Sequence, residues 1–176
     1  IGSSGPFTYD LISLRGAGDG TYAPSGTVST TSDTRRVSLG DVDGDGVLDA
    51  VVACSEAVLV SMGIGDGAFE ISEQCNLADY RDRVEEADLD GDGIVDLVTS
   101  LSSGSTTGVL LGRPDGSFLP ETSYSSTPGG VLAILDLDGD GIRDIAAGGY
   151  LGILALRGKG DGTFGSRYHH LGPALD

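Results

Sequence analysis

One aspartate-rich loop of nine residues occurs three times in this chain of 176 residues, and its spacing limits the folds that the chain can adopt. Successive copies begin 47 and 48 residues apart, so the chain is a periodic array rather than one domain with a stray acidic loop. The copies read DVDGDGVLD at residues 41–49, DLDGDGIVD at 88–96 and DLDGDGIRD at 136–144.

Each copy places carboxylates at positions 1, 3, 5 and 9, leaves the backbone carbonyl of position 7 free, and has a glycine at position 6. Calcium is a hard cation that prefers oxygen ligands, and the glycine allows the sharp turn that gathers them. Four carboxylates this close would otherwise repel one another. The loops therefore predict one calcium site in each repeat, and a solvated acidic surface without metal is the alternative.

An EF-hand or dockerin loop also opens with DxDxDG, but it needs a carboxylate at position 12 and a helix on either side. Position 12 is Val52, Thr99 or Ala147 here, and the flanking residues have the pattern of strands. The sequence therefore favours a loop between two strands.

Short glycine turns recur with the same period and alternate with the acidic loops. They read GAGDGTY at residues 16–22, GIGDGAF at 63–69, GRPDGSF at 112–118 and GKGDGTF at 158–164. The residue two positions after the last glycine of each turn is aromatic, and we expect it to be a packing residue. These aromatic residues are Tyr22, Phe69, Phe118 and Phe164.

Each repeat predicts four short strands. The first enters the acidic loop, the second leaves it, the strongly apolar third precedes the glycine turn, and the more polar fourth follows the turn. Residues 11–14 resemble a third strand without its two predecessors. Predicted first strands are 35–40, 83–87 and 130–135, second strands are 50–54, 97–101 and 145–149, and third strands are 58–62, 109–111 and 153–156.

Four antiparallel strands that recur about every 47 residues match the blade of a β-propeller, in which neighbouring sheets cover both faces of apolar strands. We therefore predict an all-β fold, with three complete blades and a half blade in a single repeat domain of residues 1–176. The predicted units are a half blade with an N-terminal extension at 1–34, and three repeats at 35–81, 82–128 and 129–176.

Three blades and a half do not close a propeller, and open blade faces and strand edges have to be covered. The sequence leaves three possibilities open. The chain is a piece of a larger propeller, or it closes as a small four-bladed ring with residues 3–9 as an extra strand, or copies complete one another in a dimer or filament.

The formal net charge of −17 comes largely from the acidic loops, which hold 12 of the 27 acidic residues. Such a surface disfavours nucleic acid and anionic membranes as partners. Loops of this kind suit millimolar extracellular calcium, so we expect a secreted or cell-surface protein. The first residues, IGSSGPFTYD, lack the features of a signal peptide, and we expect a mature or excised segment.

Cys54 and Cys75 fall on the predicted second and fourth strands of one repeat, with a whole strand between them. A disulfide would require one of them to lie beyond its strand, and two buried free thiols are the alternative. Neither has a histidine nearby, and His169 and His170 are the only histidines. No motif of a nucleophilic or metal-dependent enzyme is present, so we expect no enzymatic activity.

Four further tyrosines break the repeat pattern and are candidates for a ligand-binding surface. They are Tyr80, Tyr124, Tyr150 and Tyr168.

Taken together, the DxDxDGxxD loops and their spacing resemble the FG-GAP or VCBS repeats of integrin alpha-chain β-propellers and of many secreted bacterial and fungal proteins. The resemblance covers nearly the whole chain and implies that each loop joins the first two strands of a blade and binds one calcium ion. It assigns the following ligands, with the position-7 carbonyl completing each set: Asp41, Asp43, Asp45, Asp49 and Val47; Asp88, Asp90, Asp92, Asp96 and Ile94; Asp136, Asp138, Asp140, Asp144 and Ile142.

Two functions follow from this resemblance. The first is an extracellular, calcium-stabilised scaffold or cell-adhesion module that binds a protein, a glycan or other copies of itself by self-assembly. The alternative is a non-catalytic, substrate-binding propeller of a secreted carbohydrate-active enzyme.

Overall fold

The computed structural model describes residues 9–30, 33–54, 57–76, 83–100, 106–125, 131–149 and 152–169. These residues form strands, turns and loops, and within these ranges no helix is long and apolar enough to cross a bilayer. The predicted all-β class is confirmed.

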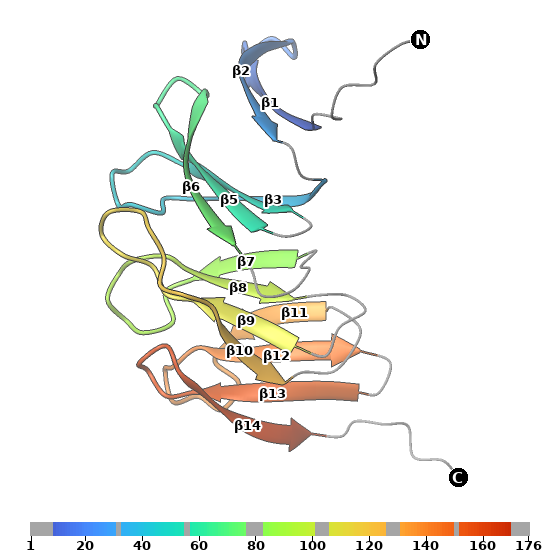
Figure 1. Cartoon of the computed structure of the whole chain (residues 1–176), viewed down its shortest axis with the longest axis vertical. Helices are drawn as coiled ribbons and strands as arrows, with labels where there is room; N and C mark the ends of the chain where they lie inside the picture. The colour runs from blue at the N-terminus through green and yellow to red at the C-terminus, as the bar shows by residue number, and fades with distance from the viewer. Residues whose placement is uncertain are drawn as a thin grey trace.

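The strands form one two-stranded and three four-stranded antiparallel sheets, each in the order of the sequence (Figure 1). The half sheet consists of β1 (Tyr9–Gly16) and β2 (Tyr22–Thr30). The first complete sheet has β3 (Thr34–Gly40), β4 (Asp49–Cys54), β5 (Ala57–Gly63) and β6 (Phe69–Asn76). The second has β7 (Arg83–Ala87), β8 (Asp96–Ser100), β9 (Thr106–Leu110) and β10 (Thr122–Ser125), and the third has β11 (Val131–Leu135), β12 (Asp144–Gly149), β13 (Gly152–Gly158) and β14 (Phe164–His169).

Apolar side chains from adjacent sheets form the core. Leu97 of β8 packs with Val51 and Val60 of the first sheet, whereas its neighbour Val98 packs with Ile145 of the third. Successive residues of a strand point to opposite faces, so one apolar strand serves two interfaces. Every residue of β4 and of β8 is buried, because neighbouring sheets cover both faces of these strands.

The sheets follow one another along the chain and lie with their first strands side by side. Strand β7 contacts both β3 and β11, and an ion pair of 2.5 Å joins Arg36 Nη2 on β3 to Glu85 Oε1 on β7. This arrangement is that of successive propeller blades, as predicted. In the described part of the chain the row stays open, with the half sheet at one end and the third sheet at the other (Figure 1).

The alternative of a small closed ring is therefore wrong for the described residues. The segment proposed to close it, residues 3–9, lies outside them except for Tyr9, which begins β1 and pairs with Thr30 of β2.

The predicted strands are confirmed to within a few residues at their ends. The third strand of the second sheet starts at Thr106 rather than Val109. The prediction started too late because the first residues of this strand are rich in hydroxyl side chains, as in a loop. Each second strand starts one residue earlier than predicted, at the last aspartate of the acidic loop. The pairs Gly40–Asp49, Ala87–Asp96 and Leu135–Asp144 already belong to the antiparallel ladders.

The repeated aromatic residues follow the prediction at the interfaces between complete sheets. Phe118 and Phe164 are buried, and Phe164 meets Tyr124 of the preceding sheet edge to face, with ring centroids 5.5 Å apart. Tyr22 is 70% exposed, which corrects its assignment as a packing residue. It belongs to the half sheet at the end of the row, where no described sheet precedes it to cover its ring.

Strand β5 separates the two cysteines, as expected. Cys54 is a buried free thiol, and the side chain of Cys75 lies outside the described residues. Burial, with a smaller contribution from Asp33, raises the pKa of the Cys54 thiol to about 11.

Candidate metal centres

Each acidic loop joins the first two strands of a complete sheet, between β3 and β4, β7 and β8, and β11 and β12. The chain can turn so sharply because the glycines at positions 4 and 6 adopt positive φ, for example 78° at Gly44 and 85° at Gly46. Residues with a Cβ atom rarely adopt this conformation. The same pair of glycines recurs in all three loops.

Hydrogen bonds from the backbone hold the carboxylates in place. Asp41 Oδ2 accepts the N–H of Gly46 at 3.0 Å, Asp43 Oδ1 accepts that of Asp45 at 3.1 Å, and Asp45 Oδ1 accepts that of Val47 at 2.7 Å. The second loop repeats all three bonds at 3.1, 3.2 and 2.8 Å. The loop thus directs its amide protons inward and its carboxylates toward one another.

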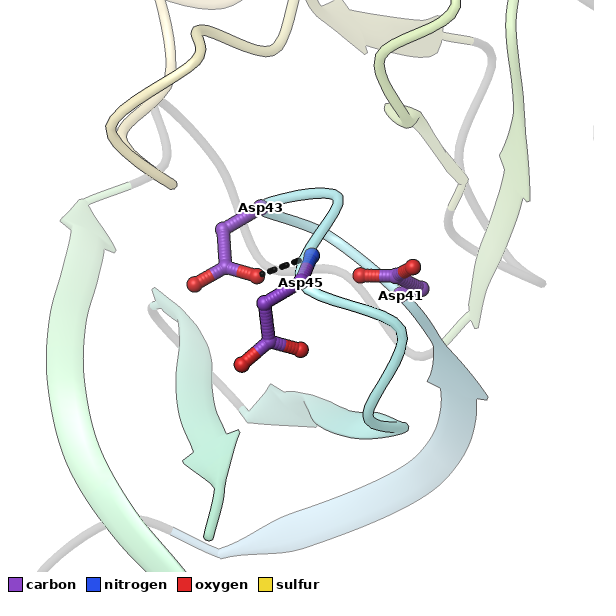
Figure 2. Close-up of side chains that lie close together, drawn as sticks. All are labelled: Asp41, Asp43 and Asp45. Atoms are coloured by element: carbon purple, nitrogen blue, oxygen red, sulfur yellow. Dashed lines mark hydrogen bonds between the residues drawn. The ribbon is translucent and has the colours of Figure 1, made fainter. Parts of the chain in front are cut away.

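In every loop three of the four predicted carboxylates converge, with one oxygen of each within 4.8 Å of the others. Figure 2 shows the first group, in which the carboxylates of Asp41, Asp43 and Asp45 lie around one turn of the chain. Asp49, Asp92 and Asp140 are the predicted ligands outside these groups. The carbonyls of Val47, Ile94 and Ile142 stay predictions. The other two groups are Asp88, Asp90 and Asp96, and Asp136, Asp138 and Asp144.

The surroundings of one carboxylate oxygen in the first group favour a cation site. Asp41 Oδ1 is buried and has no hydrogen-bond partner, although Oδ2 of the same carboxylate does. A buried carboxylate oxygen without a hydrogen-bond partner or counter-ion lowers the stability of the folded chain. Because the Asp43 and Asp45 carboxylates lie beside it, a hard divalent cation with several oxygen ligands fits this donor set.

The aspartate at position 9 has a structural task that the sequence analysis missed. Asp96 is 1% exposed, and its two oxygens accept the N–H of Leu89 and the N–H of Gly112, both at 2.8 Å. It thereby ties the start of its loop to the glycine turn that follows the third strand. Asp49 and Asp144 make the matching pairs of bonds in the other sheets.

The glycine that meets this aspartate is required by close packing. A Cβ atom on Gly112 would overlap the carbonyl oxygen of Val95, at position 8 of the loop, and Ile94 Cγ2 at 2.8 Å. Gly63 and Gly158 are enclosed in the same way in their sheets. The acidic loop and the glycine turn are therefore one structural unit, which explains why they recur together.

Burial raises the pKa of Asp96 to about 6, with the nearby charges of Asp90 and Asp92 acting in the same direction. The N–H groups of Gly112 and Leu89 oppose this shift. Burial also raises the pKa of Asp90. A cation beside these carboxylates would favour their charged forms.

The third loop differs from the others by an ion pair. Arg157, on β13, contacts Asp138 Oδ2 through Nε at 2.9 Å and Asp140 Oδ2 through Nη2 at 2.7 Å. The N–H of Ile142 and the guanidinium of Arg157 lower the pKa of Asp140.

The candidate ligand-surface tyrosines have a mixed outcome. Tyr124 is half-buried against Phe164, and its hydroxyl accepts the Phe164 N–H at 3.3 Å, so it is an interface residue between sheets. Tyr80, Tyr150, His170 and the side chains of Tyr168 and His169 lie outside the described residues.

A cavity of about 630 Å³ lies between the second and third sheets, beside their loops. Its lining combines carboxylates of β7 and the second loop with the third loop and its arginine. These residues include Glu86, Asp88, Asp90, Ile142 and Arg143. Burial raises the pKa of Glu86, against a hydrogen bond from Ser38.

Comparisons with known proteins agree with this geometry. A profile of the FG-GAP-like repeat matches residues 41–99 and 88–147, which together are more than half of the chain. The comparison with curated protein sequences found no match.

The solved structures that match this chain include a lectin of similar fold and a toxin complex. One is an Agrocybe aegerita lectin described as recognising non-reducing terminal N-acetylglucosamine, with a TM-score of 0.60 and 19% identity over 90% of this chain. This chain spans 51% of that lectin. The other is the Tc holotoxin pore of Photorhabdus luminescens, with a TM-score of 0.49 and 19% identity over 83% of this chain and 8% of that one.

Proposed function

Because the chain belongs to the FG-GAP-like repeat family, we propose that it is a non-catalytic, extracellular β-propeller module whose acidic loops bind calcium. The observation that carries the proposal is the buried, unpartnered Oδ1 of Asp41 beside the Asp43 and Asp45 carboxylates. We propose one ion in each loop, held by the three converging carboxylates, with the position-7 carbonyls of Val47, Ile94 and Ile142 as further ligands.

Bound calcium would supply the positive charge that offsets repulsion between the loop carboxylates. Its binding free energy would then add to the stability of the folded chain. Since each loop is tied to the glycine turn of its sheet through the position-9 aspartate, this stabilisation would reach the third strand as well.

Thermal unfolding in calcium, in magnesium and in chelator tests the proposal. A calcium concentration 100-fold above the dissociation constant of one site should add about 2.7 kcal/mol to the free energy of unfolding. Magnesium should restore little of this stability, because it demands a stricter octahedral geometry.

Asp45→Asn should reduce the stabilisation by calcium. The matched control is Asp66→Asn in a glycine turn, where the Asp66 carboxylate accepts the Ala68 N–H and belongs to none of the converging groups found among the described residues. Equal unfolding curves with calcium and with chelator would refute calcium binding.

For the partner, we propose a glycan or a protein, including a second copy of the chain. The cavity beside the second and third loops offers carboxylates and Arg143 for hydrogen bonds with a polar ligand. Glycans with terminal N-acetylglucosamine are the first probes, since the lectin of similar fold is described as recognising that sugar. A glycan array with and without calcium, together with light scattering for self-association, separates the possible partners. Absence of binding in both experiments would leave only an unrelated protein as partner.

A further inference from the structure

Arg157 gives the third loop a positive charge of its own. Its guanidinium bridges Asp138 Oδ2 and Asp140 Oδ2 at 2.9 and 2.7 Å, two oxygens of carboxylates predicted to bind the ion. The remaining oxygen of Asp140 accepts the Ile142 N–H, and Asp136 Oδ1 accepts the N–H of Gly139 at 2.7 Å. The second loop makes the same bond, from the Gly91 N–H to Asp88 Oδ1 at 2.7 Å, so the contact with Arg157 is the feature that sets the third loop apart.

The corresponding residues of the other complete sheets have a different task. Met62 and Leu111 also precede the first glycine of a glycine turn, but both are apolar and cross to the next sheet. The end of the Met62 side chain lies against Gly116, and that of Leu111 lies against Gly162. Both also pack against the apolar cores between sheets. Arg157 instead lies over the loop of its own sheet.

We propose that Arg157 is a built-in counter-ion that makes the three loops unequal. The third loop keeps its conformation without calcium and binds calcium more weakly than the first. This inference rests on the proposed calcium binding and adds an order of filling, in which the first loop fills at lower calcium than the third.

The expected size of the difference follows from Coulomb's law. A single positive charge about 5 Å from a divalent ion in a water-like medium weakens binding by roughly ten-fold before screening by salt. The contact is solvent-exposed, because the Arg157 side chain is 40% exposed, so a much larger effect is not expected.

Glycine amides report on each loop separately, because every loop has glycines at positions 4 and 6. A calcium titration of the whole chain labelled with 15N-glycine would follow Gly44 and Gly46 in the first loop and Gly139 and Gly141 in the third. We expect the third-loop resonances to reach their midpoint at about ten-fold higher calcium.

The test variant is Arg157→Met, which installs the residue found at this position in the first repeat. It should bring the third-loop midpoint to within about three-fold of the first and lower the melting temperature in chelator. Arg157→Lys, which keeps the charge but not the two-point bridge, should give an intermediate midpoint. Lys159→Met is the matched control, because it removes an exposed positive charge from the glycine turn of the same sheet, outside the acidic loop, and should leave both quantities nearly unchanged.

The outcomes separate this inference from the proposed function. Equal midpoints in the unmodified chain, or an unchanged third-loop midpoint in Arg157→Met, would overturn the counter-ion while leaving calcium binding intact. If no loop glycine responded to calcium, calcium binding itself would be wrong, and the order of filling would fall with it.

Discussion

Asp96 Oδ1 accepts the backbone N–H of Gly112 at 2.8 Å and so joins an acidic loop to the glycine turn that follows the neighbouring strand β9. The other oxygen accepts the Leu89 N–H at the same distance. The carboxylate is thus both a candidate ligand and a structural bridge between two segments of the chain, and these two roles can be separated by mutation.

Replacement of Asp96 by alanine should destabilise the chain with or without calcium. It leaves the N–H groups of Leu89 and Gly112 without their acceptors, which costs about 2–4 kcal/mol in total. The measurement is chemical unfolding in chelator and in calcium. Asp90→Asn is the matched control, since it alters a converging carboxylate that takes no part in the bridge, and its effect should appear only in calcium. Equal stabilities of the two variants in chelator would contradict the structural role of Asp96.

Gly112→Ala should also destabilise the chain, because the added Cβ overlaps the backbone carbonyl of Val95, which belongs to the loop and cannot rotate away. We expect a loss of about 2 kcal/mol or more in the free energy of unfolding. Gly165→Ala is the control, because a Cβ there finds only Lys159 Cε, at 4.0 Å. A neutral Gly112→Ala variant would show that the acidic loop can move away from the glycine turn.

The repeat spacing was sufficient to predict the strands and the convergence of Asp41, Asp43 and Asp45, because both depend on local sequence. The bridge from Asp96 to Gly112 was not predictable in this way, since it joins two segments that meet only when the sheet has formed. The contact of Arg157 with Asp138 depends on the same pairing of distant strands. Tyr22 was misassigned because a shared repeat position does not reveal which repeat lacks a neighbour.

Cys54 should resist alkylation in the folded chain. Its side chain is fully buried, and burial raises the pKa of its thiol to about 11. Iodoacetamide at pH 8 followed by peptide mass mapping should leave Cys54 unmodified until denaturant is added. Rapid modification of Cys54 in the native chain would show that β4 opens readily.

The same thiol predicts a loss of stability at high pH. Because the folded-state pKa lies above the ordinary value of 9.0, the folded chain keeps the thiol proton while the unfolded chain releases it. The buried neutral thiol therefore makes its full contribution to the free energy of unfolding below pH 9. About 2 kcal/mol of this contribution is lost as the pH rises to about 11. Unfolding curves at pH 8 and pH 11 for the unmodified chain and for Cys54→Ala would isolate this effect. A constant difference between the two proteins would contradict it.

Phe164 and Tyr22 occupy one repeat position, yet they should contribute very differently to stability. Phe164 is 6% exposed and packs against Tyr124 of the preceding sheet, so Phe164→Ala should cost about 3–4 kcal/mol through the cavity that it leaves. Tyr22→Ala should cost less than about 1 kcal/mol, because its ring is 70% exposed. Because both residues occupy the same repeat position, the difference between the two losses in the free energy of unfolding measures the stability gained by packing against a neighbouring sheet. If Tyr22→Ala destabilised the chain as much as Phe164→Ala, another surface would have to cover Tyr22 in solution, and light scattering of the unmodified chain would then be expected to show an oligomer.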